Sequence, residues 1–195
     1  QLVSELAAVS GVHVLGMDRF NNRLAIAEAT GIERTVRPSD SAVHPDIADF
    51  MGNYGLDCAF MCFGGEGTEA FRTVLAHMKQ SPDGHRMGRI VVVGGVYASL
   101  LFDASAGNID IRRASRTGPG YHDSNYERGW DYPNAVVPWT TRRNLEELMR
   151  MLELGRVSFF PLITDEFEVA EAAAAYDCAL TPESALGVIL RNNNT

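Results

Sequence analysis

The chain has 195 residues, of which 46% are hydrophobic and 22% charged, the proportions of one globular domain with a core. Its formal charge of −8 provides no broad basic field for a nucleic acid or an anionic membrane. The three cysteines lack C-x-x-C spacing, which excludes a disulfide framework and a zinc knuckle. We therefore expect a soluble, cytoplasmic protein that binds neither nucleic acid nor membrane and holds no metal itself.

The first half of the chain alternates between helical and strand-like patterns. Residues 1–9 have the apolar spacing of a helix, and the run 12–18 ends on Asp18 as a buried parallel strand would. Helical spacing resumes at 20–31, a minimal strand follows at 35–36, and a helix at 45–51 begins with a proline. A second buried strand at 58–63 ends in Gly64 and Gly65, a helix follows through 70–78, and a third strand at 89–93 runs into Gly94 and Gly95.

This alternation predicts a doubly wound parallel α/β sheet of Rossmann type, with three layers in the order α/β/α. The second half continues with an irregular, aromatic-rich loop at 115–138, of a length that usually has a function. A helix capped by Thr140 or Thr141 that stops at Gly155, a helix at 169–178 and a strand at 187–190 complete the pattern. We treat residues 1–195 as one dinucleotide-binding domain.

Asp18 is the clearest candidate for ligand binding, because ligands of such sheets bind at the carboxyl ends of the strands. A carboxylate there can accept hydrogen bonds from both hydroxyls of an adenosine ribose, and it repels a 2′-phosphate. That favours NAD over NADP, although Arg19 beside it keeps NADP possible. The alternative is that Asp18 caps the next helix, and the two roles can coexist. Arg23 could lie along the ribose or adenine, or be a solvated helix residue.

The two glycine pairs are a weaker signal. Glycine allows a flat ligand to approach the backbone closely, yet each pair alone could be an ordinary turn. Two pairs at strand ends of one sheet favour a site. His122 has no carboxylate or nucleophile at a defined spacing, so we interpret it as a surface histidine. Cys58 and Cys62 are expected to be core residues of their strand rather than metal ligands.

Four stretches, in order, resemble the nucleotide-binding domain of medium-chain dehydrogenase/reductases, the superfamily of zinc alcohol dehydrogenases and quinone reductases. They are Gly16-Met17-Asp18 with Arg23 and Ala27, Gly55 to Ala59 through Phe63-Gly64-Gly65, Gly88 to Gly94, and Pro161 to Thr164 followed by Phe167, Ala172 and Tyr176.

The resemblance implies a role for each of these stretches. Asp18 would bind the adenosine ribose with Arg23 beside it, and Phe63-Gly64 would border the cofactor groove. Val93, Gly94 and Gly95 would present backbone groups to the nicotinamide amide. The family's first strand and G-x-G-x-x-G turn would come before Gln1, and its separate catalytic domain has no counterpart in this sequence. We therefore expect an N-terminally incomplete domain that binds its cofactor weakly and is not catalytically competent alone, with any zinc bound outside this chain.

The predicted function is the cofactor-binding part of an NAD(H)-dependent oxidoreductase, which transfers hydride to or from a carbonyl, alcohol or activated alkene of a small-molecule substrate. No catalytic residue is identified. Because domains of this family pair edge to edge with a copy of themselves, a homodimer is expected. Two alternatives remain open: an S-adenosylmethionine-dependent methyltransferase, and a non-catalytic assembly domain that has lost its cofactor.

Overall fold

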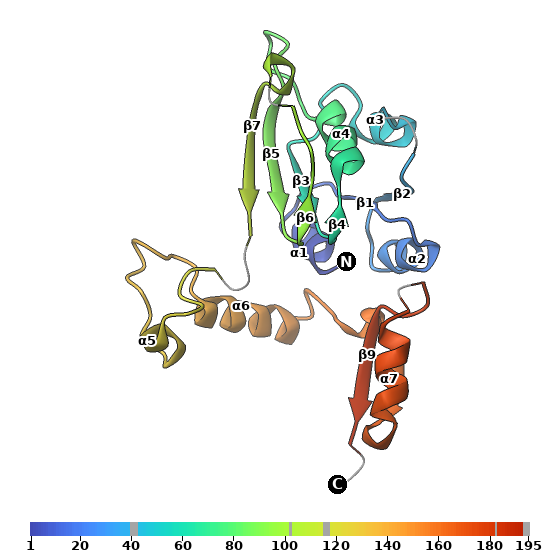
Figure 1. Cartoon of the computed structure of the whole chain (residues 1–195), viewed down its shortest axis with the longest axis vertical. Coiled ribbons are helices and arrows are strands. Elements are labelled where there is room, and N and C mark those ends of the chain that lie inside the picture. Colours follow the sequence, from blue (N-terminus) through green and yellow to red (C-terminus); the bar gives the residue numbers. More distant parts are fainter. Residues whose placement is uncertain (40–42, 102, 115–117, 182, 193–195) are drawn as a thin grey trace. The chain divides into compact units, whose positions relative to one another are not determined.

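The computed structural model describes residues 1–39, 43–101, 103–114, 118–181 and 183–192 (Figure 1). The chain divides into two compact units, which we call unit 1 (1–38 and 155–195) and unit 2 (39–154). All the strand pairs within the named sheets are parallel.

Unit 1 contains two parallel strand pairs, each with a helix. The elements are α1 (Leu2–Val9), β1 (Leu15–Met17), α2 (Asn21–Ala29), β2 (Arg34–Val36), η2 (Phe160–Leu162), β8 (Ile163–Glu168), η3 (Val169–Glu171), α7 (Ala172–Ala179) and β9 (Gly187–Arg191). β1 pairs with β2, and β8 pairs with β9. Val14, Ala27 and Ile32 form the core beneath α2, with Ala7 of α1 packed against them. The small Ala27 side chain allows α2 to lie close to the strand pair.

Unit 2 is built on a three-stranded sheet in the order β3-β5-β7, with a two-stranded extension β4-β6. Its elements are α3 (Pro45–Met51), β3 (Cys58–Met61), β4 (Gly65–Glu66), α4 (Thr68–His77), β5 (Met87–Val92), β6 (Val96–Tyr97), η1 (Ala104–Ala106), β7 (Asn108–Arg113), α5 (Ser124–Glu127) and α6 (Thr141–Glu153).

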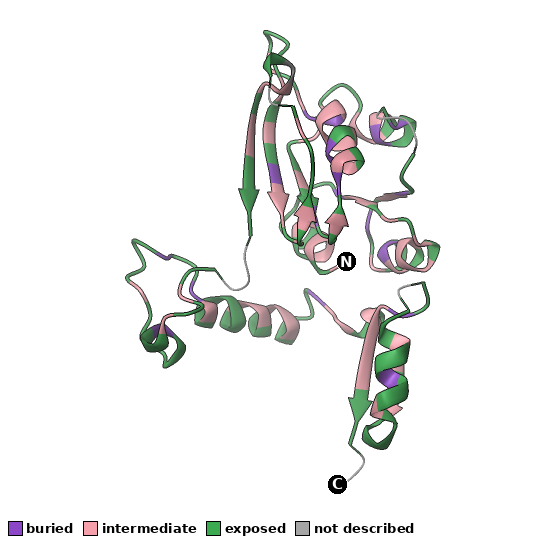
Figure 2. Ribbon diagram, viewed as in Figure 1, coloured by how far each residue is buried: buried purple, intermediate pink, exposed green. Residues whose placement is uncertain are grey.

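The core of unit 2 lies between the sheet and α4. Met61 of β3, Ile90 of β5, Phe71 of α4 and Met78 form one buried cluster. Figure 2 shows buried positions on both α4 and β5. Ile90 has no exposed surface, and burial of such a side chain stabilises a fold by about 1.5–3 kcal/mol. Helix α4 therefore packs against the sheet formed by β3 and β5.

The structure confirms the predicted α/β fold of parallel strands and helices, and it differs from the sequence analysis in local detail. β8 was not predicted as a strand, because its acidic residues interrupt the apolar run; its burial alternates residue by residue, as in a strand with one face packed. The loop predicted at 115–138 contains the one-turn helix α5, and residues 115–117 lie outside the described part. Cys58 and Cys62 are exposed, so their assignment to the core was wrong.

Two further features of the described residues concern membranes and metals. None of the helices in this part of the chain has the length and apolar character required to cross a bilayer. The same residues contain no cluster of three or more histidine, cysteine, aspartate or glutamate side chains arranged to hold a metal ion.

Candidate cofactor site

Asp18 follows β1 directly and is held by its backbone and its side chain. Its N–H donates to the carbonyl of Val36 at 3.2 Å, and its Oδ1 accepts the N–H of Phe20 at 2.9 Å. Helix α2 begins only at Asn21, and its cap residue Phe20 makes no side-chain capping bond. The alternative reading of Asp18 as the helix cap is therefore wrong. The bond from the Phe20 N–H to the Asp18 side chain closes an Asx turn, which holds the carboxylate at the end of β1.

Arg23 accompanies Asp18 from the first turn of α2. Its Nη1 lies 3.8 Å from Asp18 Oδ2, and the two side chains are 26% and 27% exposed. The Arg23 guanidinium lies 4.9 Å from the centre of the Phe20 ring, and that of Arg19 lies 4.8 Å from it. The Nε of Arg23 is buried without a hydrogen-bond partner among the described residues. Arg23 is thus a partly buried partner of Asp18 rather than a solvated helix residue.

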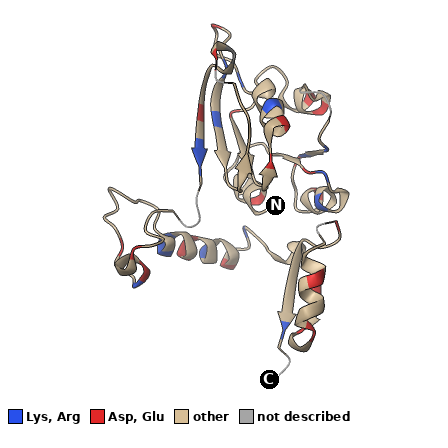
Figure 3. Ribbon diagram, viewed as in Figure 1, with Lys and Arg blue, Asp and Glu red and all other residues tan. Residues whose placement is uncertain are grey.

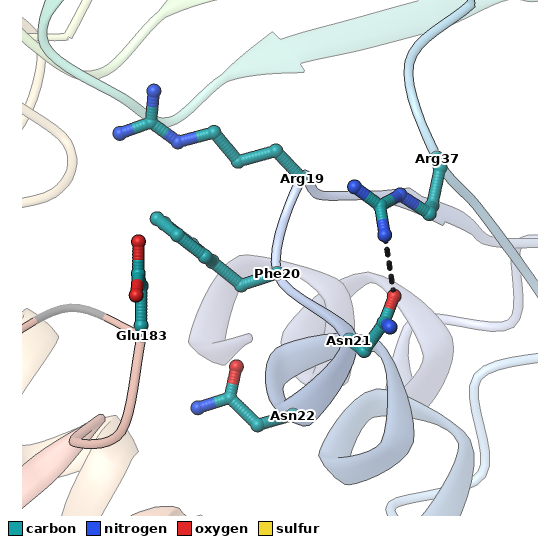
Figure 4. A pocket seen from close by; sticks show the side chains of 6 residues that line it. All are labelled: Arg19, Phe20, Asn21, Asn22, Arg37 and Glu183. Atoms are coloured by element: carbon teal, nitrogen blue, oxygen red, sulfur yellow. Dashed lines mark hydrogen bonds between the residues drawn. The ribbon is translucent and has the colours of Figure 1, made fainter.

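A pocket of about 650 Å³ opens beside this group (Figure 4). Its volume is within the range of small-molecule sites. The lining residues come from the α2 start, from the residue after β2, and from the segment before β9: Arg19, Phe20, Asn21, Asn22, Arg37 and Glu183. Sequence reasoning named only Arg19 among these. Arg37 could have been found, because it follows β2 just as Asp18 follows β1.

The other five predicted residues lie in unit 2, at the ends of β3 and β5. Gly65 N–H donates to the carbonyl of Gly95 at 3.1 Å, and β4 continues parallel to β6. The two glycine pairs therefore lie side by side. A Cβ on Gly94 would overlap the carbonyl of Phe63, so this close approach requires glycine, whereas a Cβ on Gly64 would meet only the Gly95 oxygen at 3.9 Å.

Some backbone N–H groups in the turn after β5 already form hydrogen bonds within the chain. The N–H groups of Val93 and Gly94 both donate to the carbonyl of Met61, at 2.9 and 3.2 Å. A ligand at this turn would consequently meet carbonyl groups of these two residues rather than their N–H groups. The side chains of Phe63 and Val93 are 39% and 41% exposed and form apolar surface beside the turn.

The thiols of Cys58 in β3 and of Cys62, which follows that strand, offer no reactive group to this site. Desolvation raises the pKa of both Cys58 and Cys62, and at Cys58 it outweighs the opposing charge of Arg89. Both thiols are therefore protonated at neutral pH, the form that is neither a good nucleophile nor a metal ligand.

The loop at 118–139 has its own polar network. Tyr132 Oη donates to Asp123 Oδ2 at 2.7 Å, which lowers the pKa of Asp123 and raises that of Tyr132. The rings of Tyr126 and Tyr132 stack with centres 5.0 Å apart, and Tyr126 Oη accepts the N–H of Thr141 at 2.8 Å. His122 is exposed and packs edge-on against Tyr121. The loop is thus tied to the start of α6.

Comparisons with known proteins give matches among solved structures. No family model matches the chain, and no curated protein does. 2R,3R-butanediol dehydrogenase from Bacillus subtilis is 17% identical with a TM-score of 0.66, over 98% of this chain and 47% of its own. A mycobacterial protein complexed with NADPH is 14% identical with a TM-score of 0.65, over 97% and 52%. An alcohol dehydrogenase from Escherichia coli complexed with NADH is 14% identical with a TM-score of 0.62, over 96% and 48%.

These likenesses confirm the Rossmann-type fold. They also confirm, at the level of fold, the resemblance to dehydrogenases and reductases that the sequence indicated. The chain spans about half the length of the solved proteins it matches.

Proposed function

We propose that the chain is the cofactor-binding part of an NAD(H)-dependent oxidoreductase of the medium-chain dehydrogenase/reductase superfamily. The observation that carries this proposal is the carboxylate of Asp18 at the carboxyl end of β1, beside a pocket of about 650 Å³. Solved neighbours of the same fold are complexed with NADPH or NADH. The bound nicotinamide would accept or donate hydride, and the substrate would be a small carbonyl, alcohol or activated alkene.

The residues of unit 1 fit the adenosine half of such a cofactor. Asp18 would accept hydrogen bonds from the ribose hydroxyls, Arg23 would hold its carboxylate in place, and Arg19 and Phe20 would line the adenosine pocket. The negative charge of Asp18 favours NAD(H) over NADP(H). In unit 2, by the same proposal, Phe63 and Gly64 would border a cofactor groove, and backbone groups of Val93, Gly94 and Gly95 would contact the nicotinamide amide.

Calorimetric titration of the purified chain with NADH, NADPH and S-adenosylmethionine tests this proposal. We expect NADH to bind most tightly, although weakly. Tighter binding of S-adenosylmethionine would favour the methyltransferase. Binding of none of the three, even at millimolar concentration, would favour an assembly domain without a cofactor.

We further propose that the substrate site belongs to a catalytic part outside this chain, which would also carry any zinc. The apolar side of α6 supports this. Leu145 and Met149 of that side are 58% and 56% exposed, and no residue of α6 is buried. Acidic and basic residues are interspersed along the rest of the helix, as expected for its solvated side (Figure 3). The mass of the native polypeptide tests the proposal, since a mass equal to that of this chain alone would contradict it.

A homodimer is proposed through the edge of the three-stranded sheet. β7 lies at the end of the order β3-β5-β7, where a second copy of the chain could add its own β7. Light scattering at micromolar concentration should give twice the monomer mass, and a monomer would count against this arrangement.

A further inference from the structure

We propose that Arg37 is a specificity-determining residue that admits a ribose 2′-phosphate to the pocket, so that the site accepts NADP(H) as well as NAD(H). This inference rests on the proposed function, because it concerns the adenosine end of the same site. Arg37 was not among the residues predicted from the sequence. With it in the pocket, the affinity for NAD(H) should exceed that for NADP(H) only slightly.

The first support is the register of the strands in unit 1. β1 and β2 are parallel with Met17 opposite Val36, so the next residues, Asp18 and Arg37, leave the sheet at the same edge. The bond from Asp18 N–H to the Val36 carbonyl, at 3.2 Å, continues the pairing by one residue. A ribose held by Asp18 therefore lies beside the residue that follows β2.

The second support is the orientation of the Arg37 side chain. Its Nη1 donates to Oδ1 of Asn21, the first residue of α2, at 3.0 Å, and both residues line the pocket (Figure 4). This bond directs the guanidinium toward the α2 start, where the backbone N–H groups of a helix also favour an anion. Arginine suits phosphate because its planar fork donates several parallel hydrogen bonds.

The third support is the charge around the pocket. Its lining contains the two arginines Arg19 and Arg37 against the single acidic residue Glu183. Asp18, whose charge would repel a phosphate, has Arg23 at 3.8 Å from one oxygen and accepts the N–H of Phe20 with the other. Its repulsion is thereby weakened.

A buried donor also lines the same pocket. The Nδ2 of Asn22 is buried without a hydrogen-bond partner in the described part of the chain. The pocket as a whole therefore favours an added anion, and Glu183 is the residue that opposes it.

The experiment is calorimetric titration of the whole chain with AMP and with adenosine 2′,5′-bisphosphate, which differ only in the 2′-phosphate. We expect the bisphosphate to bind no more than about tenfold more weakly than AMP, as a shallow preference requires. Arg37→Gln should weaken the bisphosphate about tenfold while AMP changes less than about twofold, because only the bisphosphate uses the charge-assisted bonds. Arg37→Lys should lie between, and Glu183→Gln should tighten the bisphosphate about threefold.

Arg72→Gln is the matched control, because it removes an exposed arginine charge in unit 2 and should leave both affinities unchanged. Circular dichroism of each variant confirms that it is folded. The inference is overturned if Arg37→Gln weakens both nucleotides equally or neither, or if the original chain binds the bisphosphate over ten times more weakly than AMP. Failure to bind AMP at all would overturn the proposed function as well, which separates the two failures.

Discussion

Replacement of Asp18 by asparagine is the most direct test of the candidate cofactor site. Asparagine retains an oxygen that can accept the Phe20 N–H, so the turn before α2 is preserved. The change removes the negative charge offered to the ribose hydroxyls. Bonds to a charged acceptor contribute about 1.5–3 kcal/mol against about 0.5–1.5 kcal/mol for neutral pairs, so we expect a loss of about 1–2 kcal/mol in NADH binding. This corresponds to roughly 5- to 30-fold weaker affinity.

The cost of Asp18→Asn to stability should be small. Asp18 and Arg23 are each about a quarter exposed and 3.8 Å apart, and such pairs contribute at most about 1 kcal/mol. The assay is calorimetric titration of NADH into both proteins, with thermal unfolding as the check on folding. Asp110→Asn is the control, since this carboxylate bonds to Arg89 in unit 2 and its loss should leave NADH affinity unchanged. Equal NADH affinity for Asp18→Asn and the original chain would refute the ribose-binding role.

Three further predictions concern stability. Gly94→Ala should destabilise the chain by about 1–3 kcal/mol, because the added Cβ would overlap the backbone carbonyl of Phe63. Gly95→Ala is the control and should be nearly neutral, because its Cβ would meet nothing within 4 Å. Equal unfolding temperatures for the two variants would contradict the packing described. Tyr126→Phe should lower the free energy of unfolding, measured in urea, by about 1 kcal/mol, because the hydroxyl that accepts the N–H of Thr141, the first residue of α6, is lost. An unchanged urea midpoint of unfolding would count against that hydrogen bond. The Asp123–Tyr132 bond lowers the pKa of Asp123, so its stabilisation is complete above the unfolded value of about 3.9 and is lost as pH falls below it. The bond also raises the pKa of Tyr132, so its stabilisation is lost above about pH 10. In Tyr132→Phe the alkaline loss of urea midpoint that comes from Tyr132 should disappear, whereas the acid loss should only become smaller, because the N–H groups of Asn125 and Tyr126 still bond to Asp123.

Much of the fold could be predicted from local patterns. The helix α3 has the predicted bounds, because Pro45 suits a first helical position, and Thr140 caps α6 as expected by accepting the N–H of Arg143. β8 could not be recognised in the same way, since half of its residues are acidic, and one of them, Asp165, lies on the less exposed side with Ile163 and Phe167. Such alternation becomes evident only when β9, more than twenty residues later, is placed beside it.

The candidate site could likewise be predicted only where its signal is local in the sequence. Asp18 was found from its position after an apolar run, which is a local signal. Arg37 was not, because its importance depends on which strand lies next to β1 and in what register. The exposure of Cys58 and Cys62 was likewise missed, because a strand pattern does not reveal whether both faces of a sheet are covered.

The parallel pairing of β1 with β2 links cofactor choice to strand alignment. Successive residues of a strand point to opposite faces, so a slip of one residue in β2 would turn Arg37 away from the pocket while leaving Asp18 in place. An insertion or deletion in the turn between α2 and β2 would thus remove the proposed phosphate contact and leave the site selective for NAD(H), without altering any residue that touches the ribose. Redesign of this selectivity can therefore begin at residues 30–33, outside the pocket itself.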